Sequence, residues 1–209
     1  MYQSSPYGAG FFPPGVKHLL IINILFFIAQ STPVVSYILD GLFVLFPPHF
    51  GIGGFPLEPY KFYPWQLVSY MFLHGNFSHI LFNLFALWMF GQQIEAQWGT
   101  RRFVTYYFLT GIGAALLHLF VSPSPVIGAS GGVFGILLAY GMLFPNRQIM
   151  LLIPPIPIKA KYLVIGYGAL ELINGIGSLQ TGVAHFAHLG GMIAGFILIK
   201  YWKMPTKLD

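Results

Sequence analysis

Charged side chains are almost absent from long stretches of this sequence. Only 7% of its 209 residues are Asp, Glu, Lys or Arg, 56% are hydrophobic, and the mean hydropathy is +0.71. Soluble domains carry about 25% charged residues, so the composition indicates an integral membrane protein. The length suits about six membrane-spanning helices joined by short loops. The predicted fold class is therefore all-α, a polytopic membrane protein built as a bundle of six transmembrane helices.

Six apolar segments fit these helices. They cover residues 17–37, with a bend expected near Pro33, and residues 73–91, 103–120, 130–144, 161–176 and 183–202. They form one membrane domain, residues 17–203, between short tails at 1–16 and 204–209. Residues 1–16 lack a basic region before an apolar core, so we interpret them as a tail and not as a signal peptide. Residues 41–65 are rich in aromatic residues, Pro and Gly, which suits a first loop lying in the membrane interface.

Lysine and arginine lie mostly on one side of this predicted arrangement. With the N-terminus in the cytoplasm, inside segments hold nine of the ten, and only Lys61 falls outside. Basic residues concentrate in the cytoplasmic loops of membrane proteins, so both termini are expected in the cytoplasm. The spread of basic residues along the chain gives no nucleic-acid signal. The absence of cysteine excludes disulfides, thiolate catalysis and cysteine-based metal sites.

Four polar side chains are expected at a similar depth, below the outer membrane surface. Ser130 begins the fourth span, His188 lies one to two turns into the sixth, and His79 and Asn83 lie about one and two turns into the second. Polar groups inside a bilayer are costly, so they are candidates for function. By itself, the Gly-rich segment around Ser130 also describes a tight turn that opens a helix, with Ser130 as its N-cap.

Small residues on the fourth and sixth spans allow these two helices to pack closely. They are Gly131 and Gly135 on the fourth span and Gly191 and Gly195 on the sixth. His188 shares a helical face with the second pair. Close packing of the two faces would bring the Ser130 hydroxyl, as a nucleophile, next to the His188 imidazole, as its base.

Together the motifs resemble those of the rhomboid family of intramembrane serine proteases, over nearly the whole chain. Gly128-Ala129-Ser130-Gly131 is similar to the family's GxSG motif, and Ala187-His188 with Gly191 and Gly195 is similar to its AHxxGxxxG motif. The second span matches the family's two histidines and one asparagine with His74, His79 and Asn83. Glu95 and Gly99 resemble its ExxxG element, and the six-span layout resembles the simple bacterial form.

The resemblance implies a role for each matching residue. Ser130 would be the nucleophile and His188 the general base, while His79, Asn83 and the backbone amide of Ser130 would stabilise the oxyanion. The supporting positions are His74, Gly128, Gly131, Phe134, Gly191 and Gly195. The implied activity is a serine endopeptidase that cuts single-span membrane proteins in or near the transmembrane segment, through an acyl-enzyme and with no cofactor or metal. The implied location is the bacterial inner membrane, with the site open to the outer side and the fifth span as a lateral gate.

Two positions depart from the family pattern. Gln66 follows Trp65 where the family often has arginine, so the anchoring of the first loop differs. Phe134 stands where many members have a tyrosine that stacks on the catalytic histidine, so the ring is kept and the hydroxyl is lost.

Three further polar residues lie in the fifth and sixth predicted spans. His185 lies one turn before His188 but lacks glycines three and seven residues later, so it is the weaker candidate for the base. Glu171 and Asn174, in the fifth span, have no role that the sequence assigns. No acidic residue is expected beside His188, so the sequence predicts a Ser-His dyad and not a triad.

Two functions of other classes remain as alternatives. A catalytically inactive rhomboid-like protein would bind membrane clients without cutting them, although the intact pair of Ser130 and His188 argues against it. A metal-dependent transporter or enzyme would use the pairs His74/His79 and His185/His188. Those spacings suit a shared metal poorly, and no carboxylate is expected to complete such a site. Substrate identity and oligomeric state are not encoded in any motif.

Overall fold

The computed structural model describes residues 12–48, 61–151, 154–177 and 184–204. Within these ranges the helices are α1 (Pro14–Gln30), α2 (Pro33–Phe43), α3 (Gln66–Ser69), a 3₁₀ turn (Tyr70–Phe72), α4 (Phe77–Trp98), α5 (Thr100–Val121), α6 (Ser130–Leu143), α7 (Ala160–Ile176) and α8 (His185–Tyr201). A short antiparallel hairpin, β1 (Gln148–Met150) and β2 (Pro157–Lys159), joins α6 to α7. The predicted all-α class is confirmed. Most of the N-terminal tail, residues 49–60 of the first loop, the loop after α7 and residues 205–209 of the C-terminal tail lie outside the described residues.

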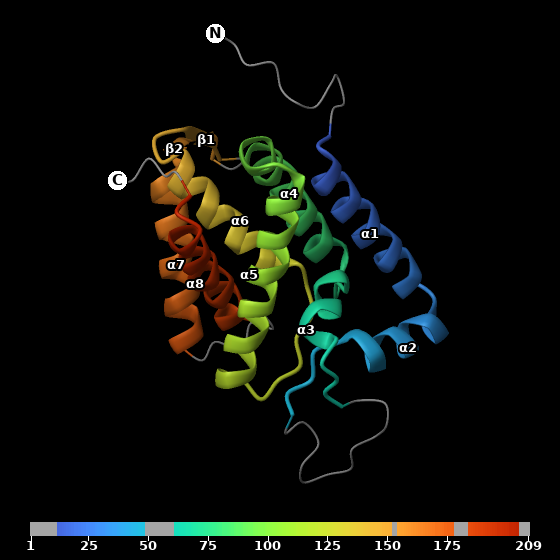
Figure 1. Ribbon diagram of the computed structural model, residues 1–209. Helices are drawn as coiled ribbons and strands as arrows, with labels where there is room; N and C mark the ends of the chain where they lie inside the picture. The colour runs from blue at the N-terminus through green and yellow to red at the C-terminus, as the bar shows by residue number, and fades with distance from the viewer. Residues whose placement is uncertain (1–11, 49–60, 152–153, 178–183, 205–209) are drawn as a thin grey trace.

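Four helices form the centre of the bundle. Figure 1 shows α4, α5, α6 and α8 packed together, with α1 against α4 at one side and α7 against α8 at the other. Helix α8 contacts α5, α6 and α7. The helices that carry Ser130, His188 and Glu171 are therefore neighbours, and α4, which carries His79, packs against α6.

The prediction of one bent helix over residues 17–37 is wrong, because the structure has two helices there. Helix α1 ends at Gln30, Thr32 is extended with φ −95° and ψ 117°, and α2 begins at Pro33. Proline fits the first turn of a helix, where its missing N–H would have no partner, and disrupts a helix interior. In Figure 1, α2 runs across the end of α1 instead of continuing it.

The second predicted span is displaced along the chain. Helix α4 starts at Phe77, after Asn76 caps it by accepting a hydrogen bond from the His79 backbone N–H (2.8 Å), and it continues to Trp98. His74 therefore precedes the helix. Asparagine is a favoured N-cap because its side-chain oxygen satisfies a first-turn N–H that has no partner within the helix.

One described helix, α5, is both long and apolar enough to cross a membrane by itself, with a mean hydropathy of 1.6. Helices α1, α2 and α6 are shorter apolar helices.

Most described basic residues lie at the end of the bundle that holds the start of α1, the α4–α5 turn, the hairpin and the end of α8 (Figure 1). They are Lys17, Arg101, Arg102, Arg147, Lys159, Lys161, Lys200 and Lys203. Ser130 and His188 lie at the other ends of their helices, away from these charges.

Glu95 fastens the start of α1 to the end of α4. Its side chain is fully buried and accepts hydrogen bonds from the backbone N–H groups of Gly15 and Val16 (both 2.8 Å) and from the Thr100 hydroxyl (2.6 Å). The first N–H groups of a helix have no partner within it, and they carry a partial positive charge. The buried Glu95 carboxylate accepts hydrogen bonds from two of these N–H groups and places a negative charge beside their partial positive charge.

Replacing Glu95 with alanine should destabilise the fold by about 3 kcal/mol, because two buried N–H groups lose their acceptor. The free energy of unfolding, measured by denaturant titration in mixed micelles, checks this. Glu95→Gln keeps one acceptor oxygen and should lose less. An alanine variant as stable as the wild type would show that the contact contributes nothing.

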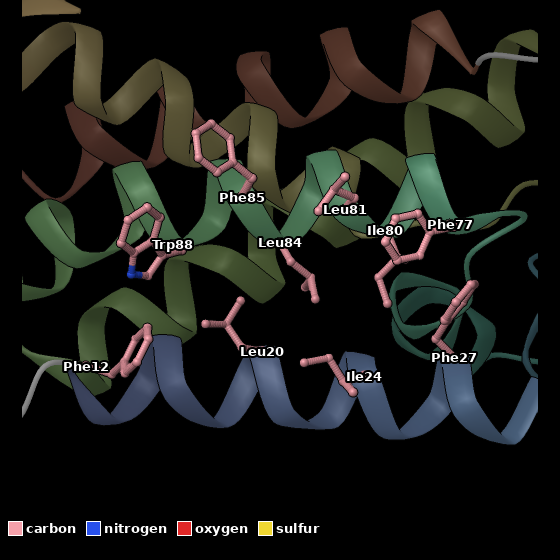
Figure 2. Close-up of a pocket in the computed structure, with 10 residues that line it drawn as sticks. All are labelled: Phe12, Leu20, Ile24, Phe27, Phe77, Ile80, Leu81, Leu84, Phe85 and Trp88. Carbon is pink, nitrogen blue, oxygen red and sulfur yellow. The ribbon is translucent and has the colours of Figure 1, made fainter. Parts of the chain in front are cut away.

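An apolar groove lies between part of α1 and part of α4 and has a volume of about 480 Å³. Figure 2 shows its lining, which consists only of aliphatic and aromatic side chains. They are Phe12, Leu20, Ile24, Phe27, Phe77, Ile80, Leu81, Leu84, Phe85 and Trp88. The groove has no nucleophile, acid or base in its lining, so the candidate site lies elsewhere.

Candidate active site

Two backbone tethers hold the segment that leads to Ser130. Val126 pairs with Leu45 of the first loop in both directions (N···O 3.0 and 3.1 Å), and the Gly128 N–H donates to the Tyr70 carbonyl (2.9 Å). Tyr70 is itself buried, and its hydroxyl donates to the Gly111 carbonyl of α5 (2.8 Å). The segment that leads to Ser130 is therefore held from two sides.

The first loop is anchored by the residue that departs from the family pattern. Gln66 is fully buried, and its Oε1 accepts from the backbone N–H groups of Phe46 (3.3 Å) and Tyr63 (3.1 Å). Its Nε2 donates to the Lys61 carbonyl (2.9 Å), and the Trp65 indole N–H donates to the Leu42 carbonyl (2.8 Å). A glutamine thus holds the loop where the family often has arginine.

Ser130 is the first residue of α6, and Ala129 occupies the N-cap position, so Ser130 is not the N-cap. Its Oγ lies 2.8 Å from His188 Nε2, within hydrogen-bond distance. The Ser130 residue is partly exposed, while His188 is buried with about 9% of its surface accessible. The first N–H groups of α6 lie beside the hydroxyl, at the positive end of the helix dipole.

The contact between α6 and α8 depends on glycine. A Cβ on Gly191 would overlap the backbone carbonyl of Gly131, so the two backbones touch at the second turn of α8. The second pair of glycines does not meet in this way. A Cβ on Gly135 would meet Thr110, and one on Gly195 would meet the Tyr106 hydroxyl, and both of these side chains belong to α5.

His79 faces the segment before Ser130. Gly128 has φ +126°, a conformation that favours glycine, and a Cβ there would lie 2.6 Å from His79 Nε2. His79 Nδ1 accepts a hydrogen bond from the Gly75 N–H (3.3 Å), so the neutral ring carries its proton on Nε2. The Nε2–H group of His79 therefore lies against Gly128, two residues before Ser130.

Asn83 and His74 are less directly placed. The Asn83 amide donates to the His79 carbonyl one turn earlier (2.9 Å), and among the described residues no hydrogen bond joins it to Ser130 or His188. The His74 ring contacts the His79 ring edge-on, with centroids 5.0 Å apart. His74 is buried, and its backbone N–H donates to Gln30 Oε1 (3.0 Å), so the residue supports His79 from before the start of α4.

The Phe134 ring covers one face of the His188 imidazole. The two rings are stacked, with centroids 4.2 Å apart and planes 5° from parallel. The ring of Tyr167, from α7, contacts the Phe134 ring in turn, nearly perpendicular to it, with centroids 6.2 Å apart. The ring of Phe134 thus supports the imidazole without the hydroxyl that a tyrosine would add.

The expectation that no acidic residue lies beside His188 is wrong. Glu171 Oε1 lies 3.1 Å from His188 Nδ1, and its Oε2 lies 2.6 Å from His185 Nδ1. The glutamate comes from α7 and the histidines from successive turns of α8, so helix packing and not sequence spacing brings them together. His185 is hydrogen-bonded to Glu171 and not to Ser130 within the described residues.

The expectation that no carboxylate completes a metal site also fails. Glu171, His185 and His188 each offer a ligand atom within 4.8 Å of the others. Nitrogen and oxygen ligands of this kind suit zinc. His188 is also in contact with Ser130, so the same imidazole would have to serve a metal and a hydroxyl.

Comparisons with known proteins identify the family. The sequence profile of the Rhomboid domain matches residues 61–203. The chain is 35% identical to the rhomboid protease GluP of Bacillus subtilis over 68% of its own length and 26% of that protein. It is 32% identical to the rhomboid protease AarA of Providencia stuartii over 69% of its length and 58% of that protein. It is 32% identical to the mitochondrial RHOMBOID-like protein 6 of Arabidopsis thaliana over 64% of its length and 42% of that protein.

The chain thus spans between about a quarter and three fifths of the length of these relatives. The profile match covers more than half of the chain and includes Glu95, Ser130, Glu171 and His188. The family is one of membrane proteins, in agreement with the composition. The chain belongs to the rhomboid family of integral membrane proteins.

Proposed function

We propose that this protein is an intramembrane serine endopeptidase that cuts single-span membrane proteins in or near their transmembrane segments. The observation that carries the proposal is the 2.8 Å contact of Ser130 Oγ with His188 Nε2, beside the first N–H groups of α6, whose N-cap residue Ala129 supplies no side-chain hydrogen bond. A hydroxyl becomes a useful nucleophile only when a base takes its proton. Two relatives that are named rhomboid proteases support the same activity.

The cycle begins when Ser130 Oγ attacks the scissile carbonyl carbon and its proton passes to His188 Nε2. The carbonyl electron pair moves onto oxygen, where the Ser130 N–H and the His79 Nε2–H stabilise it, with Asn83 as a third donor. Collapse of this intermediate breaks the C–N bond, and His188 returns the proton to the leaving amine. Water then attacks the acyl-enzyme, with His188 again as the base.

We also propose a topology of six membrane spans, with both termini in the cytoplasm and the site open to the other side of the membrane. The grouping of basic residues at one end of the bundle supports it, because such residues favour the cytoplasm. The proposed location is a bacterial cell membrane, which the two bacterial relatives support.

A fluorophosphonate probe tests the nucleophile. The purified protein in detergent with EDTA should be labelled on one residue, because the probe reacts with a serine that a base has activated. Ser130→Ala should lose the label completely, and Ser31→Ala, a serine at the end of α1, should keep it. An inactive client-binding protein would not be labelled at all, and labelling that persists in Ser130→Ala would move the nucleophile elsewhere.

A further inference from the structure

We infer that Glu171 is a positioning residue that orients His188, so that the site works as a Ser-His-Glu arrangement and not as an isolated Ser-His pair. The inference rests on the proposed function and concerns its base. It comes from the placement of α7 against α8, which brings Glu171 Oε1 within 3.1 Å of His188 Nδ1.

The carboxylate selects the useful form of the imidazole. Neutral histidine carries its proton on one ring nitrogen only. To take the Ser130 proton, His188 needs a free lone pair on Nε2, so its own proton has to be on Nδ1. Within the described residues Nδ1 has no well-aligned hydrogen-bond partner, and the Glu171 carboxylate is the acceptor at ion-pair distance. Glu171 therefore favours the form in which Nε2 faces Ser130 as an acceptor.

The imidazole is then held in two independent ways. Phe134 is parallel to its face and prevents tilting. Glu171 contacts its edge and opposes rotation within the ring plane. Together they keep Nε2 directed at Oγ, a requirement that a Ser-His pair without a third member must meet by packing alone.

His185 fixes the carboxylate. Its Nδ1 is 2.6 Å from Glu171 Oε2, so each carboxylate oxygen has one histidine partner. The two histidines occupy successive turns of α8 and present their rings to the same side chain. The sequence offered no reason for His185, and this contact supplies one.

In the described part of the chain, no lysine or arginine forms an ion pair with Glu171. Its side chain is 12% exposed. Lys161, on the same helix, is about 15 Å away along the axis, and Lys200 is about 18 Å from His188 along α8. Helix α6 carries no charged residue, and Arg101 and Arg102 lie at the far end of α5. Among the described residues, Glu171 is the carboxylate in contact with His188, so it matches the charge that develops when His188 takes the Ser130 proton.

Steady-state kinetics of Glu171→Gln test the inference, with active sites counted by the fluorophosphonate probe. We expect kcat per labelled site to fall at least about tenfold, while KM stays near the wild-type value. The fall should be smaller than the roughly 10⁴-fold loss that the equivalent change causes in soluble serine proteases. Asn174→Ala is the matched control, because Asn174 lies one turn further along α7 and its side chain makes no hydrogen bond within the described residues. It should keep wild-type kcat.

A spectroscopic readout separates positioning from folding. In protein labelled with ¹⁵N-histidine, the proton on His188 Nδ1 should resonate far downfield of the backbone amides and disappear from that region in Glu171→Gln. His185→Gln removes the other histidine of the cluster and identifies which signal belongs to His188. If Glu171→Gln only lowers the folded fraction, with kcat per labelled site and the His188 signal unchanged, the inference is wrong.

The remaining outcomes distinguish this inference from the proposed function and from a metal site. One outcome is that the wild type cuts its substrate, Ser130→Ala does not, and Glu171→Gln has the kcat of the wild type. The proposed function then stands and this inference fails. If the wild type is not labelled and does not cut, the proposed function fails instead. If EDTA reduces kcat of the wild type as the glutamine change does and Zn²⁺ restores it, Glu171 is a metal ligand, and its positioning role is overturned.

Discussion

Replacing His188 with alanine should lower kcat for a membrane substrate by about 10⁴-fold or more, because loss of the base leaves Ser130 as an ordinary alcohol. The contact that the change removes is the 2.8 Å pair of Oγ and Nε2. KM should change little, since His188 is buried and acts on the nucleophile more than on the bound chain. Kinetics with a fluorescent single-span substrate in proteoliposomes provide the measurement.

His185→Ala is the matched control for this change. It removes a histidine from the preceding turn of α8, and with it one partner of Glu171, but not the partner of Ser130. It should lower kcat far less than His188→Ala does, and by no more than Glu171→Gln does, because it removes only the residue that fixes the carboxylate. The reverse pattern, in which His185→Ala is inactive and His188→Ala cuts, would make His185 the base.

Replacing Gly191 with alanine should have the second large effect. A methyl group there overlaps the Gly131 backbone, which cannot rotate away as a side chain would, so α8 has to move away from α6. Overpacking of this kind costs about 1–3 kcal/mol. A shift of about 1 Å between reacting groups can cost about 10²-fold in rate, and Ser130 and His188 lie directly beside the contact.

Unfolding in micelles and kcat per labelled site measure the two consequences. Gly166→Ala is the control, because a Cβ at Gly166 of α7 meets nothing within 4 Å. It should be as active as the wild type and equally stable or more so, since alanine favours a helix over glycine. Wild-type stability and activity in Gly191→Ala would show that α6 and α8 do not touch at this point.

Local sequence patterns predicted the parts of the site that depend on one or two helices. The glycines at positions 131 and 191 indicated close packing of the helices that carry Ser130 and His188, and the structure has the two backbones in contact. Phe134 was expected to keep a ring over the histidine, and it stacks on His188. These residues lie within four positions of Ser130 or His188 along the sequence, so helical periodicity is enough to place them.

Contacts between distant segments were not predictable in this way. Glu171 comes close to His188 only because α7 is rotated to present it to α8, and the sequence does not state that rotation. The roles of Gln66 as the anchor of the first loop and of Glu95 as the acceptor for α1 likewise depend on backbone groups far along the chain. Pro33 did carry a usable signal, since proline begins a helix more readily than it bends one.

Cleavage of a membrane-embedded substrate tests the central claim most directly. The purified protein and a labelled single-span protein are reconstituted together in liposomes, and the products of the wild type and of Ser130→Ala are identified by mass spectrometry. The account predicts a cut in or near the transmembrane segment by the wild type and none by Ser130→Ala. Cleavage that persists in Ser130→Ala would contradict it.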